Sequence, residues 1–211
     1  MVGDRKVFRR YLGLAGALFV GALLQAQPGP IARTASAGLY TVAGSAAVSA
    51  LDLAGNKVDP FQMSDGKPLV LIFVRTDCPI SNRYAPTIQA LSKKYAGTAL
   101  MILVYPDKSE TAQDIEKHLH EYGYKIPALR DTQRELVNLS KVAITPEAAV
   151  FNRNGELTYH GRIDNWYKEF GHARVAPTTH ELDQAIRATV SGGNPAPASI
   201  GGVGCYISDL R

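Results

Sequence analysis

Leu69-Val-Leu-Ile-Phe-Val-Arg-Thr-Asp-Cys-Pro-Ile-Ser81 is the stretch of sequence that decides the fold. Its first six residues are apolar and rich in β-branched and aromatic side chains, which predicts a strand buried on both faces, as at the centre of an α/β sheet. Pro79 is tolerated in the first turn of a helix, because the N–H that proline lacks would have no partner there. The stretch therefore predicts a strand, a turn and a helix, with Cys78 at the start of the helix.

Cys78 is the best candidate for a reactive residue. At a helix N-terminus, the helix dipole and the unpaired N–H groups stabilise a thiolate and lower the pKa of the thiol. The thiolate is the form that attacks disulfides and peroxides. The alternative is a buried cysteine without chemistry, and the position of Cys78 between a buried strand and Pro79 favours the reactive interpretation.

The rest of the chain alternates between strand and helix patterns. Apolar runs predict buried strands at residues 99–105 and 147–151, and helical spacing of apolar residues predicts helices at 84–95 and 180–190. The turn at 152–155 predicts a hairpin with residues 156–162 at the sheet edge. Weaker patterns predict short strands at 48–53 and 57–61, a helix from Ser109 to about 122, an extended piece at 125–129 and a helix from Asp131 or Thr132 to 139. This order predicts an α/β arrangement in layers.

The N-terminus has the pattern of an export signal. A basic start precedes an uncharged apolar run at 11–24, and Ala26 ends a small-residue cleavage site. The run is about 14 residues long, shorter than the roughly 20 needed to cross a bilayer, so a cleaved signal is favoured over an anchor. We expect a signal peptide at 1–26, a flexible lead-in at 27–46, and a periplasmic or extracellular location with no stable membrane anchor.

The charge and the histidines indicate neither a nucleic-acid partner nor a metal. The formal net charge is +4, and the basic start of the chain accounts for most of it, so the remainder is close to neutral. Five histidines are present, but His118 and His120 would point to different faces of a helix and make a poor chelate. We expect no nucleic-acid partner, no metal and no cofactor.

Four short motifs follow one another along the chain. They are Cys78-Pro-Ile-Ser-Asn-Arg-Tyr-Ala-Pro86, Ile144-Thr-Pro-Glu147, Gly161-Arg-Ile-Asp164 and Val203-Gly-Cys-Tyr-Ile207. Together they resemble the thioredoxin-like superfamily, and most closely its exported redoxin branch related to AhpC/TSA proteins. The resemblance covers residues 47–190 and implies an α/β thioredoxin-like sandwich, with a central mixed β-sheet flanked by helices. A Gly/Pro-rich tail at 191–211, which carries Cys205, follows this domain.

The resemblance also implies roles for individual residues. Thr145 and Pro146 correspond to a cis-proline loop, in which the proline faces the active cysteine and the backbone offers hydrogen bonds to a bound peptide. Ser81 departs from the Cys-x-x-Cys pattern of the superfamily, so Cys78 has no neighbouring thiol with which to form a disulfide. A serine hydroxyl can hydrogen-bond a thiolate, but it cannot resolve a mixed disulfide.

Three interpretations of the cysteines stay open at this point. Cys205 resolves Cys78 across the fold, or Cys78 acts alone through mixed disulfides with a partner or a small thiol. In the third, Cys78 and Cys205 form a permanent disulfide, whose long loop would stabilise the protein by roughly 4–5 kcal/mol in the chain-entropy model.

The sequence-based hypothesis is an extracytoplasmic thiol–disulfide oxidoreductase with Cys78 as the nucleophile and Cys205 as the candidate resolving residue. Its expected partners are protein thiols or disulfides, a small thiol or peroxide, and a redox partner protein. A peroxiredoxin-like thiol peroxidase is the first alternative, although Leu71 and Arg75 stand where related peroxidases carry Pro and Thr. A non-catalytic binding or carrier module with a structural disulfide is the second.

Overall fold

The computed structural model describes residues 48–193 and 201–208 of the chain. The expected signal peptide at 1–26 and the lead-in at 27–46 lie outside these ranges. Within the described residues, no helix has the length and apolar character needed to cross a membrane.

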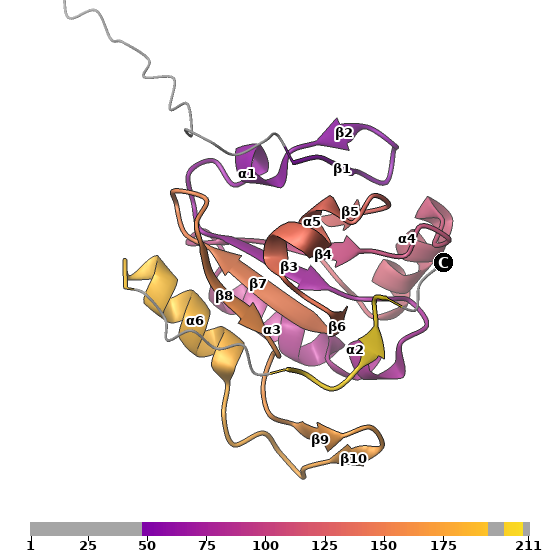
Figure 1. The fold of residues 1–211 in the computed structure, drawn as a ribbon, viewed down its shortest axis with the longest axis vertical. Helices are drawn as coiled ribbons and strands as arrows, with labels where there is room; N and C mark the ends of the chain where they lie inside the picture. Colours follow the sequence, from indigo (N-terminus) through magenta and orange to yellow (C-terminus); the bar gives the residue numbers. More distant parts are fainter. Residues whose placement is uncertain (1–47, 194–200, 209–211) are drawn as a thin grey trace, which may run out of the picture. The chain divides into compact units, whose positions relative to one another are not determined.

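A seven-stranded mixed sheet forms the centre of the fold (Figure 1). β3 (Leu69–Phe73) is an interior strand, parallel to β4 (Leu100–Tyr105) on one side and antiparallel to β7 (Glu147–Phe151) on the other. The strand order is β2-β1-β5-β4-β3-β7-β8. β2 (Lys57–Val58) and β8 (Leu157–Gly161) are the edge strands, and β1 (Ala50–Leu51) and β5 (Ala128–Arg130) lie between β2 and β4. Every residue of β3 and β7 is buried, as expected for strands covered on both faces.

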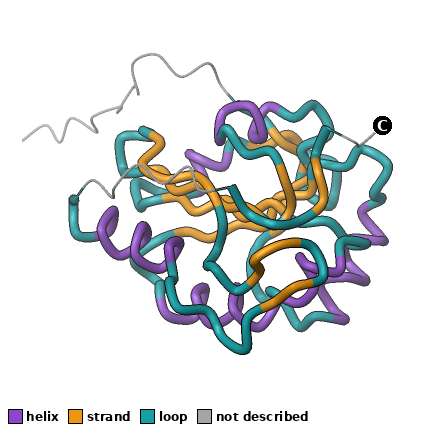
Figure 2. Tube along the Cα trace, turned by 60° about the horizontal axis from the view of Figure 1, so that its bottom comes forward, coloured by secondary structure: helices purple, strands orange, loops and turns teal. Residues whose placement is uncertain are grey.

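Helices cover both faces of this sheet (Figure 2). Alternate residues of β3 point to opposite faces, so Val70 and Ile72 join one apolar cluster while Leu71 and Phe73 join the other. The first cluster is closed by α2 (Pro79–Arg83), α3 (Ala85–Lys94), α4 (Ala112–Glu121) and α6 (Glu181–Val190). The second is closed by α1 (Pro60–Met63) and α5 (Glu135–Ser140). The predicted α/β sandwich with a central mixed sheet is confirmed.

Side-chain caps explain where the structure departs from the predicted element boundaries. The strand predicted at 57–61 ends at Val58, because the Asp59 carboxylate accepts a hydrogen bond from the Phe61 N–H and starts α1. The helix predicted from Ser109 begins at Ala112, because Thr111 and Asp114 form a reciprocal capping box.

The helix predicted from Asp131 or Thr132 begins later, at Glu135. Asp131 still serves its N-terminus, because the carboxylate accepts a hydrogen bond from the Val137 N–H at 2.9 Å. Arg134, with a φ of 58°, turns the chain between the two.

Two small antiparallel pairs outside the main sheet were not predicted. β9 (Tyr167–Glu169) and β10 (His172–Ala173) form a hairpin in the part of the chain that follows β8. β6 (Ile144–Thr145) pairs with β11 (Cys205–Tyr206), so residues 205–206 lie beside β6 (Figure 1).

Candidate active site

Cys78 lies at the junction between β3 and the helices that follow it. It is the N-cap residue of α2, with Pro79 in the first turn, and its side chain is fully buried. The Asn82 N–H donates to the Cys78 carbonyl at 3.0 Å and closes the first helical turn. The strand–turn–helix predicted around Cys78 is therefore present, and α2 leads directly into α3.

The loop before β7 faces the Cys78 side chain. The peptide bond between Thr145 and Pro146 is cis. The Cys78 thiol donates a hydrogen bond to the Thr145 carbonyl at 3.3 Å, and both residues are fully buried. The structure therefore brings Thr145, and with it Pro146, to the cysteine.

Cys205 reaches Cys78 from the far end of the sequence, 127 positions away. In the antiparallel pair of β11 and β6, Cys205 lies directly opposite Thr145. Its thiol donates a hydrogen bond to the Cys78 sulfur, with the two Sγ atoms 2.8 Å apart, and both cysteines are free thiols. The structure thus places a second thiol within bonding reach of Cys78.

The two thiols have opposite acidities. Burial opposes ionisation of Cys78, but hydrogen bonds from the Cys205 thiol and from Ser81 favour the thiolate and lower the pKa of Cys78 below its usual value. Burial, the hydrogen bond that Cys205 donates to Cys78 and the charge of a Cys78 thiolate together raise the pKa of Cys205 to about 12. Cys78 is therefore the thiol that ionises first and the stronger candidate for the nucleophile.

The Ser81 hydroxyl is fully buried, and no group in the described part of the chain satisfies it in the dithiol form. It lies near enough to Cys78 to contribute to the lowered pKa of that thiol. A buried hydroxyl gains most from a hydrogen bond when the acceptor is charged, so Ser81 is suited to a thiolate.

Residues 43–160 match the AhpC/TSA family. The chain belongs to this family. No curated protein sequence matches it.

Three solved structures share the fold of this AhpC/TSA-family protein. A hypothetical protein from Sinorhizobium meliloti aligns with a TM-score of 0.65 at 21% identity, over 77% of this chain and 90% of that one. A thioredoxin-like protein from Porphyromonas gingivalis aligns at 0.53 and 22% identity, over 70% and 92% of the two chains. The exposed lipoprotein thioredoxin of Streptococcus pneumoniae aligns at 0.50 and 18% identity, over 70% and 99%. These likenesses establish a thioredoxin-like redoxin fold.

A chain of hydrogen bonds, buried at His118 and half-buried at Asn82, holds the Cys78 turn of the AhpC/TSA-family protein. His118, on α4, is 3% exposed, and its Nδ1 lies 2.8 Å from the Tyr105 hydroxyl while its Nε2 lies 2.8 Å from Asn82 Oδ1. The Asn82 amide in turn donates to the Thr76 carbonyl at 2.9 Å, just before Cys78. Since Asn82 Oδ1 only accepts, Nε2 carries the proton and Nδ1 accepts from Tyr105. Burial lowers the pKa of His118, which keeps the ring in this neutral form.

Sequence reasoning missed this network. In the sequence, His118 is one of two histidines on a predicted helix, and Asn82 is one residue of the motif that begins at Cys78. The available signal was the spacing of Ile115 and His118, which share the buried face of α4.

Glu110 is a second buried polar residue behind the site. Its Oε1 accepts a hydrogen bond from the Thr76 N–H at 2.6 Å, and its Oε2 is buried with no partner among the described residues. Burial raises the pKa of this carboxyl. The N–H and the carbonyl of Thr76 are therefore both held by side chains, those of the buried Glu110 and the half-buried Asn82.

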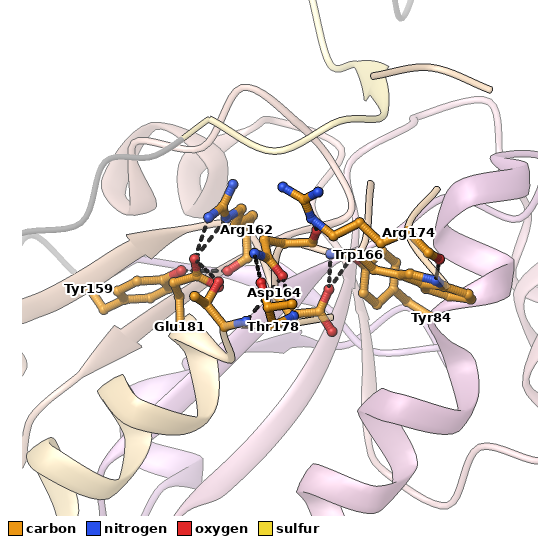
Figure 3. Close-up of polar contacts among 10 residues, drawn as sticks. Tyr84, Tyr159, Arg162, Asp164, Trp166, Arg174, Thr178 and Glu181 are labelled. Atoms are coloured by element: carbon orange, nitrogen blue, oxygen red, sulfur yellow. Dashed lines mark hydrogen bonds and ion pairs between the residues drawn. The ribbon is translucent and has the colours of Figure 1, made fainter. Parts of the chain in front are cut away.

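Residues 164–170, which follow β8, are rich in aromatic side chains, and Figure 3 shows polar contacts that Asp164 and Trp166 of this segment make. Tyr84 donates to the Asp164 carboxylate at 2.6 Å, and Trp166 packs edge-on against the Tyr84 ring. A cavity of about 50 Å³ opens between this segment and the tail, lined among others by Pro146, Asp164 and Gly202. The segment thus packs locally and also forms a wall beside the cis-proline loop.

In the described ranges, no group of three or more His, Cys, Asp or Glu side chains is placed to hold a metal ion.

Proposed function

We propose that this AhpC/TSA-family protein is an extracytoplasmic thiol–disulfide oxidoreductase in which Cys78 is the nucleophile and Cys205 resolves the mixed disulfide. The observation that carries the proposal is the 2.8 Å separation of the two free thiols, of which Cys78 has the lowered pKa. The extracytoplasmic part rests on the export pattern of the N-terminal sequence.

The reaction needs two exchange steps. The Cys78 thiolate attacks one sulfur of a substrate disulfide, the substrate S–S bond breaks, and the leaving sulfur departs as a thiolate that takes up a proton. Cys205 then loses its proton and attacks the Cys78 sulfur, which releases the second substrate sulfur as a thiolate. The substrate disulfide is reduced to two thiols, and the protein is oxidised to a Cys78–Cys205 disulfide. An external dithiol must reduce that disulfide before the next cycle.

Local structure supports the roles of the neighbouring residues. Thr145 fixes the Cys78 side chain through its carbonyl and fixes Cys205 through strand pairing. Ser81 stabilises the thiolate. The cis Thr145–Pro146 peptide forms the wall of the site opposite α2.

Reduction of insulin by dithiothreitol, followed with wild type, Cys78→Ser and Cys205→Ser, tests the proposal. Wild type is expected to accelerate the reaction, Cys78→Ser to lose all acceleration, and Cys205→Ser to accumulate a mixed disulfide on Cys78. Acceleration that survives in Cys78→Ser would overturn the proposal.

Two parallel measurements separate the alternatives. Cys78-dependent consumption of hydrogen peroxide without insulin reduction would indicate a thiol peroxidase. A Cys78–Cys205 potential below about −300 mV would indicate a structural disulfide, because such bonds resist reduction by cellular thiols.

A further inference from the structure

The tail segment 202–207 occupies the edge of β6 as an added strand. Besides the Cys205–Thr145 and Tyr206–Ile144 pairs, the Ile207 N–H donates to the Ala143 carbonyl at 2.9 Å. At the other end, the Gly202 N–H donates to a Glu147 carboxylate oxygen at 3.2 Å. The segment is therefore held along its whole length.

This strand closes the site. Cys78 is fully buried, and the Cys205 thiol covers its sulfur, with the two Sγ atoms 2.8 Å apart. A substrate sulfur can reach Cys78 only after the segment has moved away. Its departure would leave the backbone N–H and carbonyl groups of β6 unpaired, and such an edge binds another extended strand.

The contacts of the segment show what kind of strand the edge accepts. A Cβ atom on Gly204 would overlap the Thr145 carbonyl oxygen and lie 2.7 Å from its carbonyl carbon. The obstacle is backbone beside Pro146 rather than a flexible side chain, so it cannot turn aside. The residue just before the cysteine must therefore be glycine.

The two residues after Cys205 differ in how much of their side chain the site buries. Ile207 is 3% exposed and belongs to the apolar cluster that includes Val137 and Val142. Tyr206 is 59% exposed, so its side chain makes little demand on the site. The edge of β6 thus matches the pattern Gly-Cys, then any residue, then an aliphatic residue.

We propose that residues 202–207 are a tethered occupant of the strand-binding site of Cys78, and that the site selects protein substrates presenting an extended Gly-Cys-x-aliphatic segment. The inference rests on the proposed function, because it names the substrate class of that reaction. The substrate cysteine lies opposite Thr145, where Cys205 lies in the closed form. Cys78 attacks its sulfur, and the bonded partner sulfur leaves as a thiolate.

Resolution then requires Cys205 to return to the same edge. Since β6 has room for one strand there, the returning tail displaces the substrate segment as Cys205 attacks Cys78. The formation of the Cys78–Cys205 disulfide and the release of the reduced segment are thus one event.

The first test measures how fast iodoacetamide alkylates Cys78 in the reduced full-length protein. All variants carry Cys205→Ser, so that Cys78 is the single thiol. Adding Gly204→Ala is expected to expel the tail and raise the alkylation rate at least about tenfold, the ratio that ~1.4 kcal/mol of lost tail binding gives. Adding Tyr206→Ala is the matched control, and it should leave the rate unchanged. Equal alkylation rates with and without Gly204→Ala would overturn the proposal that residues 202–207 occupy the strand-binding site.

The second test uses the peptide Gly-Val-Gly-Cys-Tyr-Ile-Ser, activated as a 2-thiopyridyl disulfide, on the Cys205→Ser/Gly204→Ala protein. The release of thiopyridone should be at least about tenfold faster than with a peptide that has alanine before the cysteine. A peptide with serine in place of tyrosine should react like the parent. Equal rates for the glycine and alanine peptides would overturn the selectivity.

Both tests are single reactions of Cys78 and need no turnover. If insulin reduction fails while the alkylation and peptide differences appear, the proposed function is wrong and the strand site stands. If insulin reduction succeeds and the differences are absent, only this inference fails.

Discussion

Gly204 and Thr145 approach so closely that no side chain fits between them. This contact sets Cys205 opposite Thr145 and its sulfur 2.8 Å from that of Cys78. Position 81, where a second thiol could lie beside Cys78, is a serine, and the second thiol comes instead from Cys205.

The acidity of Cys78 depends on the donor at position 205. Cys205→Ala removes the hydrogen bond to the Cys78 sulfur, whereas Cys205→Ser keeps a donor there, so the pKa of Cys78 should rise further in the alanine variant. A thiolate forms as the pH rises through the pKa, so at neutral pH the alanine variant should contain the smaller thiolate fraction. The ultraviolet absorbance of the thiolate, titrated with pH, measures this. Identical titrations of the two variants would show that a hydrogen-bond donor at position 205 does not lower the pKa of Cys78.

Ser81→Ala should change acidity and stability in different ways. The variant loses a stabiliser of the thiolate, so the pKa of Cys78 should rise. It also removes a buried hydroxyl that has no partner among the residues the structure describes, so its free energy of unfolding should stay the same or increase by about 1 kcal/mol. Ser140→Ala is the matched control, since that hydroxyl is equally buried and unpartnered but lies on α5. An unchanged Cys78 titration in Ser81→Ala would exclude the role of Ser81.

His118 is expected to position Cys78 through Asn82. His118→Leu leaves the Tyr105 hydroxyl and the Asn82 amide oxygen without their partner, which should cost about 1–3 kcal/mol of unfolding free energy. It should also slow the reaction of Cys78 with peptide disulfides, because Asn82 holds the Thr76 carbonyl. Denaturant unfolding and the rate of thiopyridone release measure the two effects.

The control for this prediction is His120→Leu. His120 lies on the same helix with its side chain exposed, so the same substitution should change stability by no more than about 0.5 kcal/mol. If His118→Leu loses stability but reacts at the rate of wild type, His118 is structural and does not position the cysteine.

Glu110 should make stability depend on pH. Burial raises the pKa of its carboxyl, so the folded protein holds this proton more tightly than the unfolded chain does. Stability is then lost as the pH rises from the unfolded pKa through the folded pKa. Glu110→Gln keeps an acceptor for the Thr76 N–H and removes the charge, so its gain in stability over wild type should grow across that window and then level off. Melting temperatures of both proteins between acid and neutral pH measure this gain, and a constant difference would contradict the account.

The strongest sequence patterns corresponded to buried strands. The runs at 69–74 and 147–151 became β3 and β7 because a strand between two layers must be apolar on both faces. Cys78 could be placed in the same way, since the end of β3 and Pro79 define the turn locally.

Other features depend on contacts that local patterns do not contain. The pairing of β6 with β11 joins strands of two residues each from distant parts of the chain. The need for Gly204 there follows only from its close approach to the Thr145 carbonyl in the folded protein. His118 lies on a polar helix, and its burial follows from the packing of α4 against Tyr105.

The most direct test of the central claim is the product of one encounter between the reduced full-length protein and one equivalent of a small disulfide such as 2,2′-dithiodipyridine. Intact-mass and peptide mass spectrometry identify that product. The account requires a chain two hydrogens lighter, with Cys78 linked to Cys205 and both thiols of the reagent released. A stable adduct on Cys78 beside a free Cys205, or an adduct on Cys205 itself, would contradict it.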